Sequence, residues 1–79
     1  MELHDRIALN IIEKLDSKNI SIENNDKIKS YALYLSQKTS IKYSRARIIL
    51  TIKTKRSIMV KELMEIADIL KVSLTELIK

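Results

Sequence analysis

The sequence predicts an all-α domain, and this prediction is based on its composition and on the spacing of its hydrophobic residues. The 79 residues include no glycine and no proline, so tight primed hairpin turns are not expected. Hydrophobic residues make up 46% of the chain, enough for a packed core, and most recur at helical spacing. The length allows one modest core. We therefore expect residues 1–79 to form one compact domain of five helices joined by polar turns.

The first helix is predicted over residues 2–16, where apolar residues recur at every fourth position: Leu3, Ile7, Ile11 and Leu15. Acidic Glu2 and Asp5 in its first turn suit the helix dipole. Asn19 is expected to end this segment, because asparagine tolerates the left-handed conformation that glycine would otherwise supply. A short connector over residues 20–23 follows.

The second helix is predicted to begin after Asn24 or Asn25, either of which can cap it. One stripe of this helix is apolar and is expected to face the core: Ile28, Tyr31, Ala32 and Leu35. The helix should fade in the polar run over residues 36–40, which contains no breaker stronger than serine and threonine.

The third helix is predicted over residues 44–53, with Ser44 as its N-cap and Ile48 and Ile52 facing inward. An earlier start, capped by Ser40 and adding Ile41 to the apolar stripe, is the alternative. Residues 54–57 are polar and are expected to form a loop.

The fourth helix is predicted over residues 60–70, and its expected inward face comprises Val60, Leu63, Met64, Ala67 and Leu70. Three acids on this helix, Glu62, Glu65 and Asp68, are expected on a solvated outer face. Lys71 ends the helix. The S-x-x-E sequence from Ser73 to Glu76 then has the form of a capping box, which predicts a short last helix ending at Ile78.

Charge is unevenly distributed along the chain. The net charge is +5, yet no acidic residue lies between Lys27 and Lys61, and that window holds ten cations. The window is therefore +10 and the remaining residues together are −5. A basic middle between acidic ends indicates a polyanionic partner, although lysines scattered over a solvated face give the same count.

Several classes of function are disfavoured by composition. The chain has no cysteine and a single histidine, His4, so thiolate or histidine-built metal sites are not expected. No nucleophile–base pair is evident, so we expect neither catalysis nor a cofactor. The longest apolar run is residues 48–50, and no signal-peptide pattern opens the sequence. We therefore expect a cytoplasmic protein that does not enter a membrane.

Two stretches in the second half carry a family pattern. The stretch from Leu63 to Leu77 is similar to L-x-x-I-A-x-x-L-G-V-S-x-x-E-L, with Lys71 where glycine is usual. Without a gap, residues 54–56 fall on G-K-R, and Ser44 to Ile48 falls on S-R-S-T-I. These motifs resemble the last part of the lambda-repressor-like (Cro/CI, XRE-type) helix-turn-helix DNA-binding family. The resemblance covers residues 44–78.

The sequence departs from that family pattern at three places. The chain from Leu35 to Ser44 is longer than the family's usual turn, which predicts an elongated helix 2–helix 3 connection. The family's phosphate-binding glutamine falls on Ile28, with Lys27 or Lys29 as substitutes. Ile49 and Leu50 stand at positions that are polar in many members. They either touch the DNA groove, are buried, or offer an apolar patch to a protein; we favour burial of at least one.

The resemblance implies a sequence-specific double-stranded DNA-binding transcriptional regulator, a repressor or phage/mobile-element switch protein, with residues 44–53 in the major groove. Candidate base contacts are Arg45 and Arg47, whose forks fit guanine, together with Ala46 and Ile49. Candidate phosphate contacts are Lys42, Tyr43, Ser44, Lys53, Lys55 and Arg56. Tyr43 has a second interpretation, packing beside helix 2.

The partners implied are double-stranded DNA and a second copy of the chain, since such domains usually bind paired half-sites as homodimers. Dimer contacts are expected from the last helix (Leu74, Leu77, Ile78) or from helix 1. The alternative is a protein-binding module on the same scaffold: an antirepressor, a modulator of a partner repressor, or an antitoxin. Non-specific nucleic-acid binding is a third interpretation.

Overall fold

The computed structural model describes residues 3–51 and 58–79, and within them the chain is helical, with no strand. The helices in these ranges are α1 (Leu3–Asp16), α2 (Lys27–Lys38), α3 (Tyr43–Leu50), α4 (Val60–Leu70) and α5 (Leu74–Ile78). The expected all-α architecture is therefore confirmed. Among the described helices, none has the length and apolarity needed to cross a bilayer.

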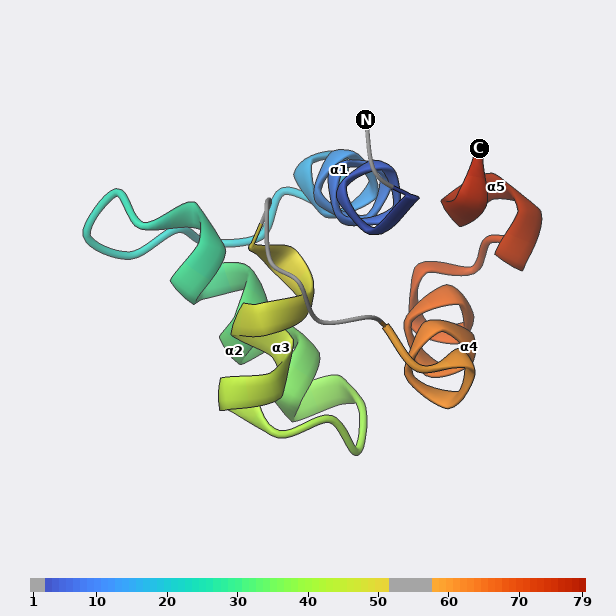
Figure 1. The fold of residues 1–79 in the computed structure, drawn as a ribbon. Coiled ribbons are helices and arrows are strands. Elements are labelled where there is room, and N and C mark those ends of the chain that lie inside the picture. Colours follow the sequence, from blue (N-terminus) through green and yellow to red (C-terminus); the bar gives the residue numbers. More distant parts are fainter. Residues whose placement is uncertain (1–2, 52–57) are drawn as a thin grey trace.

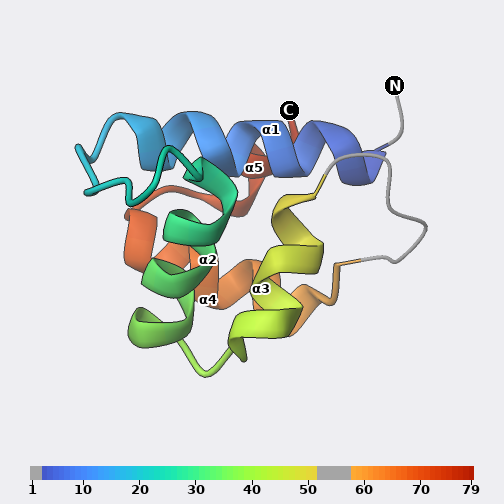
Figure 2. The same ribbon diagram turned by 90° about the vertical axis from the view of Figure 1, so that its left-hand side faces the viewer.

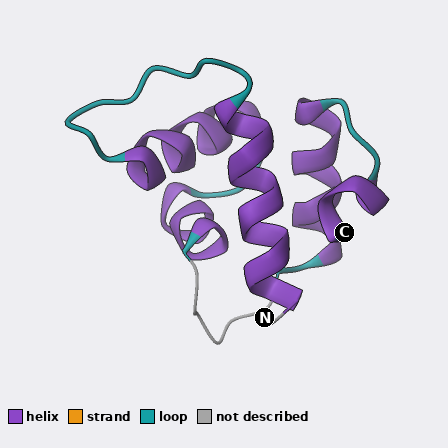
Figure 3. Cartoon of the chain, turned by 90° about the horizontal axis from the view of Figure 1, so that it is seen from above, coloured by secondary structure: helices purple, strands orange, loops and turns teal. Residues whose placement is uncertain are grey.

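Helix α1 lies across the other helices (Figures 1 and 2). On one side of it α2 and α3 pack against each other, and on the other side lie α4 and α5. Seen from above, α1 occupies the middle of the molecule (Figure 3). The amide of Asn10 in α1 donates a 2.8 Å hydrogen bond to the backbone carbonyl of Leu77 in α5, which fixes the last helix against the first.

The core is one apolar cluster to which every helix contributes. The side chains that are fully buried or nearly so include Ile11 and Leu15 of α1, Leu35 of α2, Leu50 of α3 and Leu77 of α5. Because α1 crosses both pairs of helices, its single apolar stripe joins the two sides of the domain.

Several expected boundaries are confirmed. Helix α4 spans the predicted residues, and Lys71 ends it with φ of 57°. Asn19 follows α1 with φ of 56°. The hydroxyl of Ser73 accepts a hydrogen bond from the backbone N–H of Glu76, so the predicted cap of α5 is present. In a chain without glycine, Asn19 and Lys71 take the left-handed conformation at the helix ends, and Ser73 caps the start of α5.

The region from the α2 start to α3 differs from the prediction. Helix α2 is capped by Asp26, whereas Asn24 and Asn25 adopt positive φ of 52° and 57° in the preceding turn. The expected elongated connection is wrong. The helix continues to Lys38, so the extra residues lengthen α2 and leave only residues 39–42 between α2 and α3.

Helix α3 starts at Tyr43, with Lys42 as N-cap, so Ser44 lies inside the helix and neither it nor Ser40 is the cap. It ends at Leu50, before the predicted end at residue 53. In α4, Val60 and Met64 are 69% and 55% exposed although we predicted them inward. The buried stripe is Leu63, Ile66, Ala67 and Leu70, and Met64 lies about 100° around the helix from Leu63.

Candidate functional site

Helix α3 has two unlike faces. Its inner face is apolar and fully buried, formed by Ala46, Ile49 and Leu50, each 0% exposed. Its outer face comprises Ser44, Arg47, Ile48 and Thr51, which with Tyr43 line a shallow hollow at the surface. Base contacts by Ala46 and Ile49 are therefore excluded in this conformation, because both side chains point into the core. Ile48, expected inward, is only partly buried.

The expected burial of Ile49 or Leu50 is confirmed for both residues. The family alignment placed them at polar positions, but their spacing from Ala46 (three and four residues) puts all three on one side of a helix. Ile52, the other residue predicted to face inward, lies outside the described residues, as do the predicted phosphate contacts Lys53, Lys55 and Arg56.

Arg45 lies at the edge between the two faces of α3 and is held by α4. Its Nε donates to Glu62 Oε2 at 2.6 Å and its Nη2 donates to Glu62 Oε1 at 2.8 Å. Glu62 Oε1 also accepts the backbone N–H of Met59 at 2.9 Å. The carboxylate therefore fixes Arg45 and caps α4 at the same time, and this guanidinium is turned to α4 more than to solvent.

The electrostatics of this pair follow from its geometry. The side chains of Arg45 and Glu62 are only 25% and 12% exposed, so water screens the pair weakly. The hydrogen bonds from Arg45 hold the pKa of Glu62 below its ordinary range, and the same bonds raise the pKa of Arg45. Both groups are charged near neutral pH, and the pair stabilises the α3–α4 contact.

A second carboxylate of α4 holds the connection before α3. Glu65 Oε1 accepts the backbone N–H of Ser40 at 3.0 Å, and Ser40 Oγ donates to both carboxylate oxygens at 2.8 Å. These bonds lower the pKa of Glu65. We expected Glu62 and Glu65 on a solvated outer face. Instead they orient the start of α3, a role that sequence spacing did not reveal because both partners are far away in the chain.

Arg47 is the exposed cation in the middle of the outer α3 face. Its guanidinium carbon lies 5.9 Å from the centre of the Tyr43 ring, one turn earlier, in a cation–π contact. Tyr43 is partly buried and packs against the core cluster, to which α2 contributes Tyr31, Ala32 and Leu35. Within the described chain no carboxylate forms an ion pair with Arg47, and its side chain is exposed.

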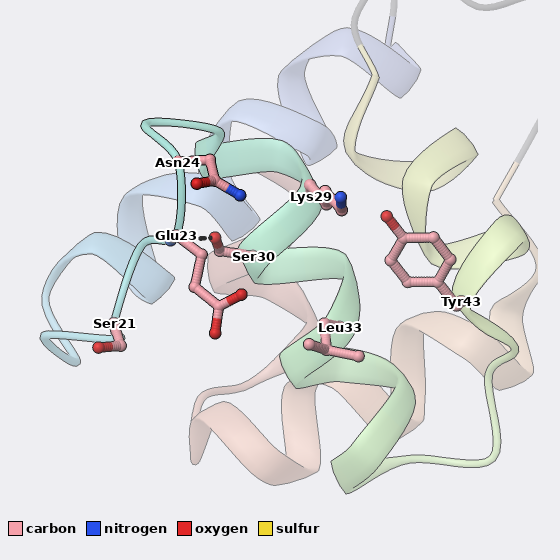
Figure 4. Close-up of a pocket in the computed structure, with 7 residues that line it drawn as sticks. All are labelled: Ser21, Glu23, Asn24, Lys29, Ser30, Leu33 and Tyr43. Carbon is pink, nitrogen blue, oxygen red and sulfur yellow. Dashed lines mark hydrogen bonds between the residues drawn. The ribbon is translucent and has the colours of Figure 1, made fainter.

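A groove of about 260 Å³ lies beside this face, between α2 and the start of α3 (Figure 4). Its floor is α2, one wall is the turn over residues 21–24, and the other is Tyr43. Figure 4 shows the side chains of Lys29 and Tyr43 facing each other across the gap, with Leu33 below them. The backbone N–H of Glu23 donates to Ser30 Oγ at 2.9 Å, which fastens the turn to α2.

The two lysines at the start of α2 have different surroundings. Lys27 Nζ lies 3.1 Å from Asp16 Oδ1, which also accepts a 2.5 Å hydrogen bond from the Tyr31 hydroxyl. The Tyr31 and Lys27 bonds lower the pKa of Asp16, while burial and Asp16 raise the pKa of Tyr31 to about 12. Lys27 is thus engaged with α1. Lys29 has no ion-pair partner among the described residues and projects beside the outer α3 face.

The described part of the predicted site therefore divides into three groups. Lys42, Ser44 and Arg47 are exposed at or on α3, and Lys29 joins them from α2. Arg45 is paired with Glu62. Ala46 and Ile49 belong to the core. Lys29 was only one of two alternatives on sequence, since nothing in the local pattern shows that Asp16 would engage Lys27.

Metal binding has no candidate site in the part of the chain that the structure describes. No group of three or more histidine, cysteine, aspartate or glutamate side chains there is arranged to hold a metal ion. Comparison of the chain with protein-family models, with curated proteins and with solved structures finds no match to any of them. The exposed face of α3 and the groove beside it are therefore the features of this molecule that bear on its function.

Proposed function

We propose that this chain is a double-stranded DNA-binding transcriptional regulator of the lambda-repressor-like helix-turn-helix type, with α3 in the major groove. The observation that carries the proposal is the division of α3 into a buried apolar face and an exposed face that contains Arg47 and no acidic residue. A recognition helix needs both faces, one to fix it on the domain and one to meet base edges.

The geometry around α3 supports the proposal. Helices α2 and α3 are joined by residues 39–42. The turn of a helix-turn-helix unit has about three to four residues, so this connection has the expected length. Two side chains of α4 hold this region: Glu65 fixes the turn and Glu62 fixes Arg45. A rigidly held helix loses little conformational freedom when it enters the groove, which favours binding.

The start of α3 also suits a phosphate. Lys42 at the N-cap makes no side-chain capping bond and the first turn holds no acid, so the backbone N–H groups there are available to an anion. Lys42 is the N-cap residue itself, and Lys29 lies across the groove from Tyr43 (Figure 4). In the proposed complex they contact the DNA backbone and fix the register, while Arg47 and Ser44 face the bases.

The alternative of a protein-binding modulator was based on three features: an apolar patch at Ile49 and Leu50, the missing phosphate-binding glutamine, and the longer chain between helices 2 and 3. Ile49 and Leu50 are buried and the extra residues lengthen α2, so of these features only Ile28 at the glutamine position remains. The DNA-binding proposal is therefore the one that a specific feature of the surface favours, and the two are separated by whether the isolated protein shifts DNA.

The test is selection of duplexes from a random library, followed by fluorescence anisotropy with the selected duplex and an unrelated one of equal length. We expect the selected duplex to bind at least about a thousandfold more tightly, with affinity falling steeply as salt rises. Equal affinity for both duplexes would indicate non-specific binding. Failure to bind any duplex at low salt would overturn the proposal.

A further inference from the structure

The exposed face of α4 carries an unusual concentration of apolar surface. Val60 and Met64, four residues apart on one stripe of the helix, are 69% and 55% exposed, and among the described residues only Leu3 and the N-cap Met59 are comparably exposed large apolar side chains. Helix α4 lies at the edge of the molecule, on the side away from α2 (Figure 1). Contiguous exposed apolar residues of this kind commonly mark an interaction surface.

We propose that this face binds a second copy of the chain, with the two α4 helices antiparallel and crossing at Met64. The α4 face, as we call it, comprises Val60, Lys61, Met64 and Asp68, which lie on one stripe of the helix. Its occupant is identified by the charges that stand on either side of Met64.

The charges are arranged for self-pairing. Lys61 precedes Met64 by three residues and Asp68 follows it by four, so they lie about 4.5 and 6 Å from it along the helix axis, in opposite directions. An antiparallel two-fold pair centred on Met64 brings Lys61 of each copy to nearly the same height as Asp68 of the other. Both lie on the same side of Met64 around the helix, so the pair forms twice.

The same charges disfavour other arrangements. A parallel pair would place Lys61 against Lys61 and Asp68 against Asp68, and would align the two helix dipoles unfavourably. Within the part of the chain described, the structure gives neither Lys61 nor Asp68 an ion-pair partner. The α4 face is thus complementary to itself, and a two-fold contact closes after two copies.

This surface differs from the dimer contacts expected on sequence. Leu77 of α5 is 0% exposed and packs in the core, so it is unavailable to a partner. Leu74 is partly buried, and Ile78 is 42% exposed. Self-association through α4 is measured without DNA, so the inference does not depend on the proposed function.

The first experiment is a charge exchange followed by sedimentation equilibrium. Lys61→Glu and Asp68→Lys each replace two attractive contacts by two repulsive ones. We expect each to raise the dimer dissociation constant about tenfold or more. The double variant Lys61→Glu with Asp68→Lys restores both pairs and should return to within about threefold of the wild type. A double variant as weak as the two single effects combined would overturn the proposal, as would a wild type that stays monomeric at millimolar concentration.

The second experiment uses the absence of cysteine from the chain. Met64→Cys places one thiol near the proposed two-fold axis, where two copies can come within disulfide distance. Leu33→Cys, at a 42% exposed position on α2, is the matched control. On mild oxidation we expect a covalent dimer from Met64→Cys at least about tenfold faster than from Leu33→Cys, because a held pair has a high effective concentration. Equal rates would overturn the proposal.

Discussion

The inner and outer faces of α3 are formed by neighbouring residues that differ in burial. Ala46, Ile49 and Leu50 are fully buried, while Ser44 and Arg47, a residue or two away in sequence, are exposed. A helix of eight residues is too short to be stable alone, so the inner face is what makes α3 a helix at all. Because the inner face stabilises the helix, the residues of the outer face can serve binding without a large effect on stability. The predictions below separate the two faces by which quantity changes, stability or affinity.

The largest effect is expected on the inner face. Leu50→Ala removes a fully buried side chain from the core and should lower the free energy of unfolding by about 2–5 kcal/mol. Urea denaturation followed by circular dichroism measures it. Ile48→Ala, two positions away and only partly buried, is the control and should lower the free energy of unfolding clearly less. Equal losses for the two variants would mean that the division of faces is misassigned.

The next effect is expected at the edge between the faces. Glu62→Gln removes the negative partner of Arg45 and should lower the free energy of unfolding by about 1.5–3 kcal/mol at pH 7. Because the pKa of Glu62 is depressed in the folded state, its contribution is complete above the unfolded value, near pH 4.3, and is lost as pH falls through the folded pKa.

The stability difference between wild type and Glu62→Gln should therefore shrink as the solution is acidified below about pH 4. Denaturation of both proteins at several pH values checks the sign. Glu13→Gln, at an exposed carboxylate on α1 that is in none of the ion pairs of the described residues, serves as the control, with a change within about 0.5 kcal/mol. A difference that grows on acidification would contradict the assigned ion pair.

A loss of affinity without loss of stability is expected on the outer face. Arg47→Ala should weaken binding of the selected duplex by about 1–3 kcal/mol and relax preference at one base pair. Its unfolding free energy should change by less than about 1 kcal/mol, because its ring contact with Tyr43 is exposed. Lys79→Ala, at an exposed cation that follows α5, is the charge-matched control, and this variant should bind the selected duplex nearly as well as the wild type.

The smallest effect is expected at α2. Lys29→Ala should weaken binding to all duplexes about equally and reduce the slope of log affinity against log salt by about one unit. Lys27→Ala is the comparison, because its side chain is already paired with Asp16. A larger change in slope for Lys27→Ala than for Lys29→Ala would show that Lys27, and not Lys29, contacts the DNA phosphate.

Much of the fold was predictable because its signals are local. The α1 stripe, the turn at Asn19, the span of α4 and the Ser73 cap all depend on residues within a few positions of each other. The start of α3 was not predictable in this way. Ser44 has a good capping side chain, but burial of Ala46, Ile49 and Leu50 decides the position of the helix, and burial depends on α1 and α2.

The candidate site was predicted least well where partners come from distant parts of the chain. Arg45 appeared to be a base-reading arginine because its local motif matched a recognition helix, yet Glu62, seventeen residues later, holds it. The resemblance makes Ile49 a candidate base contact, although burial of Ile49 or Leu50 was the favoured interpretation, and Ile49 lies on the same buried face as Ala46. Helical spacing alone does not choose the buried face, because it also groups Ile48 with Ile52, the pair expected inward. Packing against the rest of the core decides which stripe is buried.

The central claim, that the outer face of α3 binds duplex DNA, is tested most directly by nuclear magnetic resonance. The backbone amide signals of the labelled protein would be followed while the selected duplex is added. The account predicts the largest shifts at Ser44, Arg47, Ile48 and Thr51, smaller ones around Lys29, and little change in α5. Shifts concentrated on α4 or α1, with α3 unaffected, would contradict it.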